Sequence, residues 1–133
     1  IAPHSKYGIN LVVLNKPKSS VSEAFRALRS NIKFIAKSPQ EGQAQVIAVT
    51  SSVGGEGKTF LSINLASVLS LGDHKVVLVG VDLRKPKIFN DFGLSNDVGL
   101  SNYLAGHSTM PEIVQKSGSK YISCGIRKML HVQ

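Results

Sequence analysis

The residues best suited to chemistry lie in one glycine-rich stretch near the middle of the 133-residue chain. Residues 54–59 have the sequence Gly-Gly-Glu-Gly-Lys-Thr. Glycines let consecutive backbone N–H groups turn toward one point without Cβ clashes, and such a concave surface binds anions. Lys58 could place an ammonium on the β- and γ-phosphates of a nucleotide, and the Thr59 hydroxyl could ligate Mg²⁺. The stretch is therefore predicted to be a phosphate-binding loop.

The segments on either side of this loop supply the context that a phosphate-binding loop requires. Residues 46–49 are a short apolar, β-branched run that predicts a buried strand, and residues 60–71 have the pattern of a helix. The helix is expected to bury Leu61, Leu65, Val68 and Leu69. That helix would add unpaired N–H groups and the positive end of its dipole. The strict phosphate-loop pattern has Gly at position 52, where this chain has Ser52. A glycine-rich turn without a ligand is the alternative interpretation.

A second candidate for chemistry is Asp82, which follows the apolar run 75–81. This run predicts a second buried strand. The carboxyl ends of parallel strands lie on one side of a sheet, so Asp82 would lie beside the phosphate loop. There it could hold Mg²⁺, directly or through a water, or accept a proton from an attacking hydroxyl. A helix cap or a turn is the alternative role for this residue.

Three charged residues, Glu23, Arg26 and Arg29, recur at intervals of three within the predicted helix 20–37. Ser20 and Glu23 have the spacing of a capping box at its start. The helix also carries an apolar stripe, formed by Val21, Ala24, Phe25, Leu28, Ile32 and Ile35. The charged residues could pair within the helix, or an arginine could meet a carboxylate on a neighbouring molecule. Spacing alone favours pairing within the helix.

Composition indicates one modest globular domain, with 42% hydrophobic residues. The net charge of +8 suits three kinds of partner: nucleic acid, an anionic membrane surface or nucleotide phosphates. No basic block with interleaved aromatic residues occurs, so nucleic-acid binding is not favoured. Cys124 is the only cysteine, which excludes an internal disulfide, and no apolar run is long enough to cross a bilayer. Because Ile1 is the first residue, we expect a piece of a longer protein.

The remaining segments complete the expected organisation. Residues 1–19 are predicted to be a linker or arm with a short extended stretch at 11–14. Short helices are expected at residues 99–105 and 108–116, and a third parallel strand at 120–124. Phe89 and Phe92 are expected to pack inside. The domain proper would span residues 20–125, followed by an atypical tail at 126–133.

Four motifs, in this order, resemble the bacterial tyrosine kinases (BY-kinases), P-loop autokinases that control the chain length and export of capsular polysaccharide and exopolysaccharide. The first is Glu-x-x-Arg-x-x-Arg in residues 22–31, and the second is the Walker A-like run 50–59, continued by Asn-Leu-Ala at 64–66. The third, Asp-Leu-Arg-Lys-Pro at 82–86, is similar to the Walker A′ motif. The fourth is residues 99–106. Their joint occurrence is far more specific than any single match.

The resemblance implies an α/β fold, a P-loop NTPase-type doubly wound parallel sheet that is incomplete in this chain. It implies that ATP phosphates are held by Gly54, Gly55, Glu56, Gly57, Lys58, Thr59 and Phe60. Lys58 and Asp82 would be catalytic, and Thr59 and Asp82 would hold Mg²⁺. The acceptor would be a tyrosine hydroxyl in the C-terminal tail of a neighbouring subunit.

The resemblance also implies an assembly and a location. Glu23, Arg26 and Arg29 would form the contact between subunits of a ring-type homo-oligomer, which reverses the preference from spacing alone. The domain would follow a membrane region of its own or be activated by a membrane-spanning chain-length regulator. It would then lie in the cytoplasm, at the inner face of the cell membrane.

Three departures from the family pattern bear on activity. The family's Walker A′ strand ends in Asp-x-Asp, and here the first of these positions is Gly80. No apolar strand ending in Asp, the Walker B motif, is recognisable, since Asp91 and Asp97 do not follow one. The tyrosine-rich tail is absent and residues 126–133 look foreign, so truncation or a frameshift is expected. A sheet lacking strands would leave an exposed hydrophobic edge.

Three functions are therefore weighed. The first is an ATP-binding part of a tyrosine autokinase. The second is a nucleotide-dependent switch like the partition and septum-placement ATPases, against which Val53 argues because it stands where their signature lysine would be. The third is an assembly module that binds nucleotide without transferring phosphate, which Gly80 favours over a working kinase. Dimers that form with ATP would indicate the second function, and larger rings would indicate the first.

Overall fold

The computed structural model describes residues 8, 10–36, 39–72, 74–83, 88–116 and 129–132. Their helices and strands follow in the order α1 (Val12–Asn15), α2 (Ser20–Ile35), α3 (Lys58–Leu71), β1 (Val76–Val79), α4 (Ile88–Phe92), α5 (Leu100–Leu104), α6 (Met110–Ile113), β2 (Val114–Lys116) and β3 (Met129–Val132).

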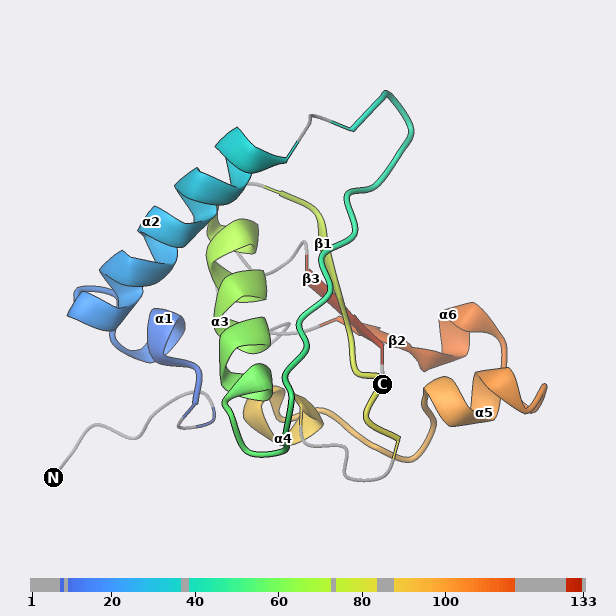
Figure 1. Ribbon diagram of the computed structural model, residues 1–133. Helices are drawn as coiled ribbons and strands as arrows, with labels where there is room; N and C mark the ends of the chain where they lie inside the picture. Colours follow the sequence, from blue (N-terminus) through green and yellow to red (C-terminus); the bar gives the residue numbers. More distant parts are fainter. Residues whose placement is uncertain are drawn as a thin grey trace, which may run out of the picture.

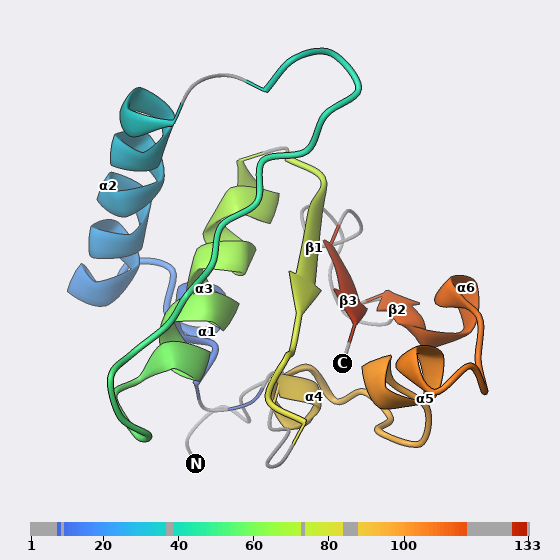
Figure 2. The same cartoon turned by 45° about the vertical axis from the view of Figure 1, so that its right-hand side comes forward.

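The described elements form layers with α3 in the middle. Helix α3 lies between α2 on one side and β1 on the other (Figures 1 and 2), and it contacts both. The described sheet has the order β1-β3-β2, with β3 parallel to β1 and antiparallel to β2. Helices α5 and α6 lie beyond β2, at the end of the molecule away from α2 (Figure 1). The parallel pairing of β1 agrees with the predicted fold class, whereas the predicted strand at 120–124 lies outside the described residues.

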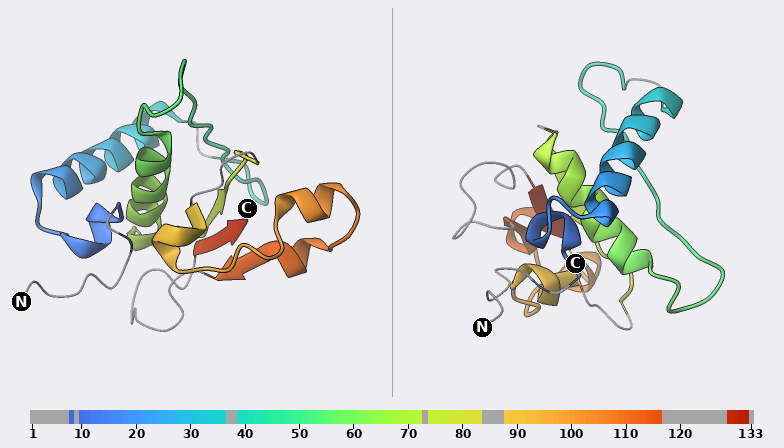
Figure 3. Two further views of the ribbon diagram at one scale, coloured as in Figure 1. Left: turned by 90° about the horizontal axis from the view of Figure 1, so that it is seen from below. Right: turned by 90° about the vertical axis from the view of Figure 1, so that its left-hand side faces the viewer.

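The strand predicted at residues 46–49 is wrong. These residues are extended but have no place in the described sheet, and Val46 is 88% exposed. The segment that contains them runs outside the body of helices and strands as an open loop leading to α3 (Figure 3). An apolar run becomes a strand only when a neighbour completes its hydrogen bonds, and β1 pairs with β3 instead. In this sheet β1 is an edge strand, and the half-exposed Val77 and Val79 give it the apolar edge that was expected.

The extended stretch predicted at residues 11–14 is also wrong, because this segment forms the short helix α1. Leu11 and Val13 are completely buried. The Asn15 amide donates to the Leu11 carbonyl at 3.0 Å, which closes the helical turn. Burial against α2 and α3 overrides the β preference of the two valines in this run. The segment predicted to be an arm therefore contributes to the core.

Helix α2 confirms the prediction for residues 20–37, with a different cap. Its N-cap is Ser19, whose hydroxyl accepts a hydrogen bond from the Ser22 amide at 3.2 Å. The predicted capping box of Ser20 with Glu23 is therefore not formed, because the N-cap lies one residue earlier. Ser22 is buried and donates its hydroxyl hydrogen to the Lys16 carbonyl at 2.7 Å. The start of α2 is fixed by a serine that faces the protein interior.

The core consists of two apolar clusters that share α3. Toward the sheet the buried residues are Leu11, Ile63, Ala66 and Leu78, and toward α2 they are Val13, Phe25, Leu65 and Val68. Partly buried residues pack around them, namely Leu14, Val76, Ile88 and Phe92 on the first cluster and Leu28, Ile32, Phe60 and Leu69 on the second. The expected packing of Phe92, Leu65, Val68 and Leu69 is confirmed. Leu61, expected to be buried, is 38% exposed, and at the ends of the α2 stripe Val21 and Ile35 are exposed too.

The C-terminal predictions hold in part. Helix α5 confirms the helix predicted at 99–105, and β1 confirms the core of the strand predicted at 75–81. The helix predicted at 108–116 ends early, because the chain turns into β2 after Ile113. The Thr109 amide and hydroxyl both donate to the Glu112 carboxylate, which lowers the pKa of Glu112 below its usual value. This local cap supports a helix of one turn only.

Asn64 ties the N-terminal segment to α3. It is completely buried, and its Oδ1 accepts from the Val13 amide at 3.0 Å. Its Nδ2 donates to the Asn10 carbonyl at 2.7 Å and to the Phe60 carbonyl at 2.9 Å. These hydrogen bonds form only when the N-terminal segment packs on α3. The buried amide therefore stabilises this packing, because any other packing would leave its polar groups unpaired.

We expect Asn64→Ala to lower the free energy of unfolding by about 1–3 kcal/mol, because it leaves buried backbone groups without partners. Urea denaturation measures this as a lower midpoint at unchanged slope. The control is Ser30→Ala on exposed α2 surface, where a change below about 0.5 kcal/mol is expected. Equal midpoints for the wild type and the Asn64 variant would contradict the role of the amide.

Candidate functional site

The loop before α3 has the backbone shape that its glycines predicted. Gly55 and Gly57 have φ angles of 84° and 89°, in the left-handed region that favours glycine. Gly57 is the N-cap residue of α3, so the first free N–H groups of the helix follow it directly. The loop therefore presents a helix N-terminus to solvent behind a glycine turn, which suits a phosphate group.

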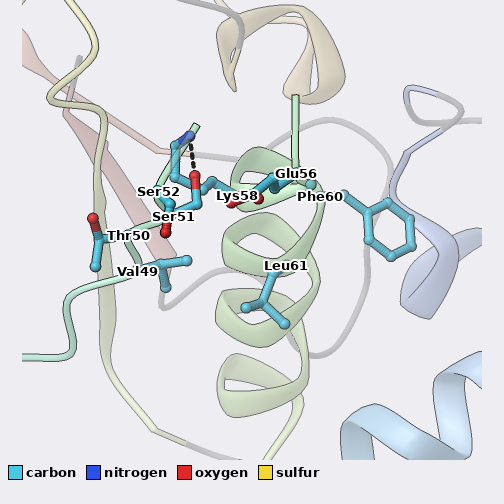
Figure 4. A pocket seen from close by; sticks show the side chains of 9 residues that line it. Val49, Thr50, Ser51, Ser52, Glu56, Lys58, Phe60 and Leu61 are labelled. Carbon is cyan, nitrogen blue, oxygen red and sulfur yellow. Dashed lines mark hydrogen bonds between the residues drawn. The ribbon is translucent and has the colours of Figure 1, made fainter. Parts of the chain in front are cut away.

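Lys58 folds back over this loop. Its Nζ donates to the Ser51 hydroxyl at 2.7 Å and lies 3.5 Å from the Val53 carbonyl oxygen. The Ser51 hydroxyl in turn donates to the same Val53 carbonyl at 2.7 Å. Figure 4 shows the lysine side chain reaching across to Ser51. The cation predicted to meet phosphates is thus held at the loop by two neighbours from the segment before it.

An open pocket of about 460 Å³ lies at this loop. It is lined by Val49, Thr50, Ser51, Ser52, Glu56, Gly57, Lys58, Phe60 and Leu61 (Figure 4). Four of the predicted binding residues are in this set, namely Glu56, Gly57, Lys58 and Phe60. Gly54, Gly55 and Thr59 belong to the same loop but not to the lining.

Phe60 takes part in packing more than in the pocket. Its ring lies 6.0 Å from the ring of Phe25 on α2, at an angle of 58°. In Figure 4 the ring points away from Lys58 and the serines. Any contact of Phe60 with a nucleotide would therefore come through its backbone.

Asp82 is not among the residues that line the pocket. It is exposed and lies three residues beyond the end of β1. Figure 2 shows that the chain leaving β1 and the loop before α3 lie at the same end of the molecule, although the segment before the loop is not a strand. Gly80, directly after β1, is buried and offers no side chain to this region.

Glu23, Arg26 and Arg29 make hydrogen bonds within this chain. The carboxylate of Glu23 pairs with the guanidinium of Arg26, which also donates to the Pro17 carbonyl. Arg29 donates to the Val68 carbonyl at 2.9 Å, near the C-terminal end of α3. The pairing that spacing favoured is the one observed, and a contact between subunits stays a prediction.

The described residues contain no ready-made metal centre and no membrane-spanning helix. In that part of the chain no three His, Cys, Asp or Glu side chains gather as metal ligands. Within the same residues, no helix combines the length and apolar character needed to span a bilayer. The Thr59 hydroxyl, partly buried at the start of α3, is an oxygen donor of the kind Mg²⁺ prefers, and such ions are completed by nucleotide phosphates. The loop fits a nucleotide, and it fits Mg²⁺ only together with that nucleotide.

Sequence reasoning missed Ser51 as a member of the site. The signal that could have found it is a hydroxyl residue inside the Walker A-like run 50–59, three positions before Gly54. Its role depends on the folding of Lys58 back across the turn, which residue spacing does not reveal.

Comparison with known proteins defines the class. The family model for the CobQ/CobB/MinD/ParA nucleotide binding domain matches residues 47–132. The chain therefore belongs to this family of nucleotide-binding domains.

The relatives narrow the comparison to one branch. Tyrosine-protein kinase YwqD of Bacillus subtilis is 38% identical over 113 residues, which are 85% of this chain and 46% of that protein. The solved kinase domain of the Escherichia coli tyrosine kinase ETK has 31% identity and a TM-score of 0.79, covering 98% of this chain and 47% of its own. The chimerical protein CapA2B2 has 34% identity and a TM-score of 0.71, covering 92% and 50%. The resemblance to bacterial tyrosine kinases and the α/β P-loop fold class are confirmed, and the chain spans at most about half of these relatives.

We expect Gly57→Ala to lower the free energy of unfolding by about 1–2 kcal/mol, because a Cβ at this φ is strained even though open space surrounds it. Gly54→Ala is the matched control, since a Cβ there also meets open space and Gly54 is not among the glycines with positive φ. Urea denaturation of both variants gives the comparison. Equal losses at the two positions would contradict the assigned loop shape.

Proposed function

We propose that this chain is the ATP-binding part of a bacterial protein-tyrosine autokinase that serves the synthesis and export of capsular polysaccharide or exopolysaccharide. The observation that carries the proposal is the glycine loop that opens α3, with Lys58 folded over its pocket. Membership of a nucleotide-binding family supports ATP as the ligand. Relatives named as tyrosine-protein kinases, one of them in a cps region, support the reaction and its setting.

The proposed reaction is ATP plus a protein tyrosine giving ADP plus phosphotyrosine. The tyrosine oxygen forms a bond to the γ-phosphorus while the bond from that phosphorus to the β,γ-bridging oxygen breaks, and the tyrosine proton passes to the Asp82 carboxylate or to water. Backbone N–H groups of residues 54–60 and the Lys58 ammonium would hold the phosphates and offset their charge. Such catalysis consists mainly of positioning and charge stabilisation. Thr59 and Asp82 would hold Mg²⁺, which when bound would supply positive charge to offset the charge of the phosphates.

Gly80 is expected to slow phosphate transfer, because it has no carboxylate to contribute to that step. It is buried immediately after β1, at the position where the kinase motif has its first carboxylate. Loss of a positioned general base typically costs about 10²–10⁴-fold in rate. We therefore propose that this chain binds nucleotide but transfers phosphate weakly, so that a nucleotide-binding assembly module is the second candidate function.

The partners belong to the same proposal. A ring-type homo-oligomer would use the Glu23, Arg26 and Arg29 helix, and the parent would join a membrane-spanning chain-length regulator or carry its own membrane domain. The net charge of +8 suits the anionic inner face of a bacterial cell membrane, and no nucleic-acid partner is proposed. Sedimentation with Mg·ATP separates rings from the dimers expected of a partition-type switch. A monomer at all concentrations would contradict assembly through this helix.

We expect the wild-type chain to bind Mg·ADP and Mg·ATP, and Lys58→Ala to bind them at least ~10-fold more weakly, because a charge-assisted contact to phosphate is lost. Isothermal titration calorimetry measures both affinities. Lys33→Ala, which removes an exposed lysine of α2, is the control and should bind like the wild type. Equal affinities for the Lys58 variant and the wild type would contradict the assigned loop.

Gly80→Asp should raise the rate of phosphate transfer at least ~10-fold by restoring a carboxylate that can accept the tyrosine proton. Transfer from radiolabelled ATP to a synthetic tyrosine peptide measures the rate. Gly80→Asn is the control, with nearly the same shape and no charge, and it should stay at the wild-type level. Wild-type transfer that already matches Gly80→Asp would show that this position does not limit the reaction.

A further inference from the structure

We propose that Ser51 is a positioning residue that holds the Lys58 ammonium at the pocket before nucleotide arrives. The inference rests on the proposed nucleotide-binding function and adds a residue to it. Ser51 lies outside the Gly-Gly-Glu-Gly-Lys-Thr run, and its role follows from the folded loop.

The hydrogen bonds around Ser51 have a fixed direction. A serine hydroxyl carries one hydrogen, and here that hydrogen is donated to the Val53 carbonyl at 2.7 Å. The lone pairs of the same oxygen then face Lys58, whose Nζ donates to it at 2.7 Å. An ammonium can only donate, so the hydroxyl and the cation have matched roles. The Val53 carbonyl orients the serine, and the serine orients the lysine.

This arrangement leaves donor capacity on Lys58 for a ligand. An ammonium has three hydrogens, and one is used by Ser51. The Val53 carbonyl lies 3.5 Å from Nζ, at the outer limit of a hydrogen bond. The remaining donors can therefore serve a phosphate while the bond to Ser51 persists.

Holding the lysine in advance should strengthen nucleotide binding. A lysine side chain has several rotatable bonds and loses rotamer freedom when it is fixed on a ligand. Lys58 and Ser51 are both only partly buried, and the pocket is open, so packing alone does not fix the lysine. Because Ser51 restrains the side chain in the free protein, less freedom remains to be lost on binding. The opposite possibility is that Ser51 competes with phosphate, and its removal would then tighten binding.

The test compares Ser51→Ala with Ser51→Thr, which keeps the hydroxyl, and with Ser30→Ala as the control. Ser30 is an exposed serine of α2 and is not part of the pocket lining. We expect calorimetry with Mg·ADP to give Ser51→Ala a dissociation constant ~3- to 10-fold higher than wild type, the range for one hydrogen bond. Ser51→Thr and Ser30→Ala should remain within ~2-fold of the wild type.

A second readout needs no nucleotide. In the free protein, acetylation of Lys58 by acetic anhydride, measured by mass spectrometry against the exposed Lys33, should be faster in Ser51→Ala than in wild type. Failure of the wild type to bind nucleotide would overturn the proposed function, and the acetylation rates would then decide the Ser51 contact alone. Unchanged acetylation in Ser51→Ala would overturn the inference. So would Mg·ADP binding by that variant equal to or tighter than wild type.

Discussion

Helix α3 has to bury two opposite faces at once, and the other elements depend on this constraint. One face packs on β1 with Ile63 and Ala66, and the other packs on α2 with Leu65 and Val68. Burial of such side chains contributes about 1.5–3 kcal/mol for each large one. Because both faces are occupied, the helix cannot rotate or slide without breaking two clusters. The position of its first residue, Lys58, is thereby fixed by packing about one to three turns further along the helix.

The elements that could be predicted from the sequence are those whose conformation is determined by residues close together in the chain. The glycine loop, α2 and α3 could be predicted because caps, glycines and helical periodicity act over a few residues. The strand expected at 46–49 failed because pairing is a property of two segments, and nothing within an apolar run states whether a neighbour is available. Helix α1 was missed because burial of Leu11 and Val13 decides its conformation. At the site, Lys58 was predictable from its motif, whereas the role of Ser51 follows from a hydrogen bond across the turn.

The three charged residues of α2, Glu23, Arg26 and Arg29, differ in how strongly the fold of this chain holds them. Glu23 and Arg26 pair on exposed surface, where such a pair contributes about 0–1 kcal/mol and is easily exchanged for another partner. Arg29 is different, because it donates to a carbonyl near the C-terminal end of α3, where a cation also offsets the helix dipole. It therefore joins α2 to α3 within one chain. An assembly that used all three residues would exchange the Glu23–Arg26 pair for contacts with another subunit at little cost. Its use of Arg29 would compete with the hydrogen bond from Arg29 to the Val68 carbonyl.

The proposed binding and the proposed transfer would depend on different parts of this chain, so that one could persist without the other. Phosphate binding would need one continuous stretch, the loop and the start of α3, together with Ser51 before it. Transfer also needs carboxylates brought in from the ends of strands, and here the buried position after β1 is Gly80. A local site survives as long as α3 is packed, whereas a site assembled from several strands requires the whole sheet and the correct residue at each strand end. A nucleotide-binding loop with weak chemistry is the expected result of keeping the first requirement and losing one residue of the second.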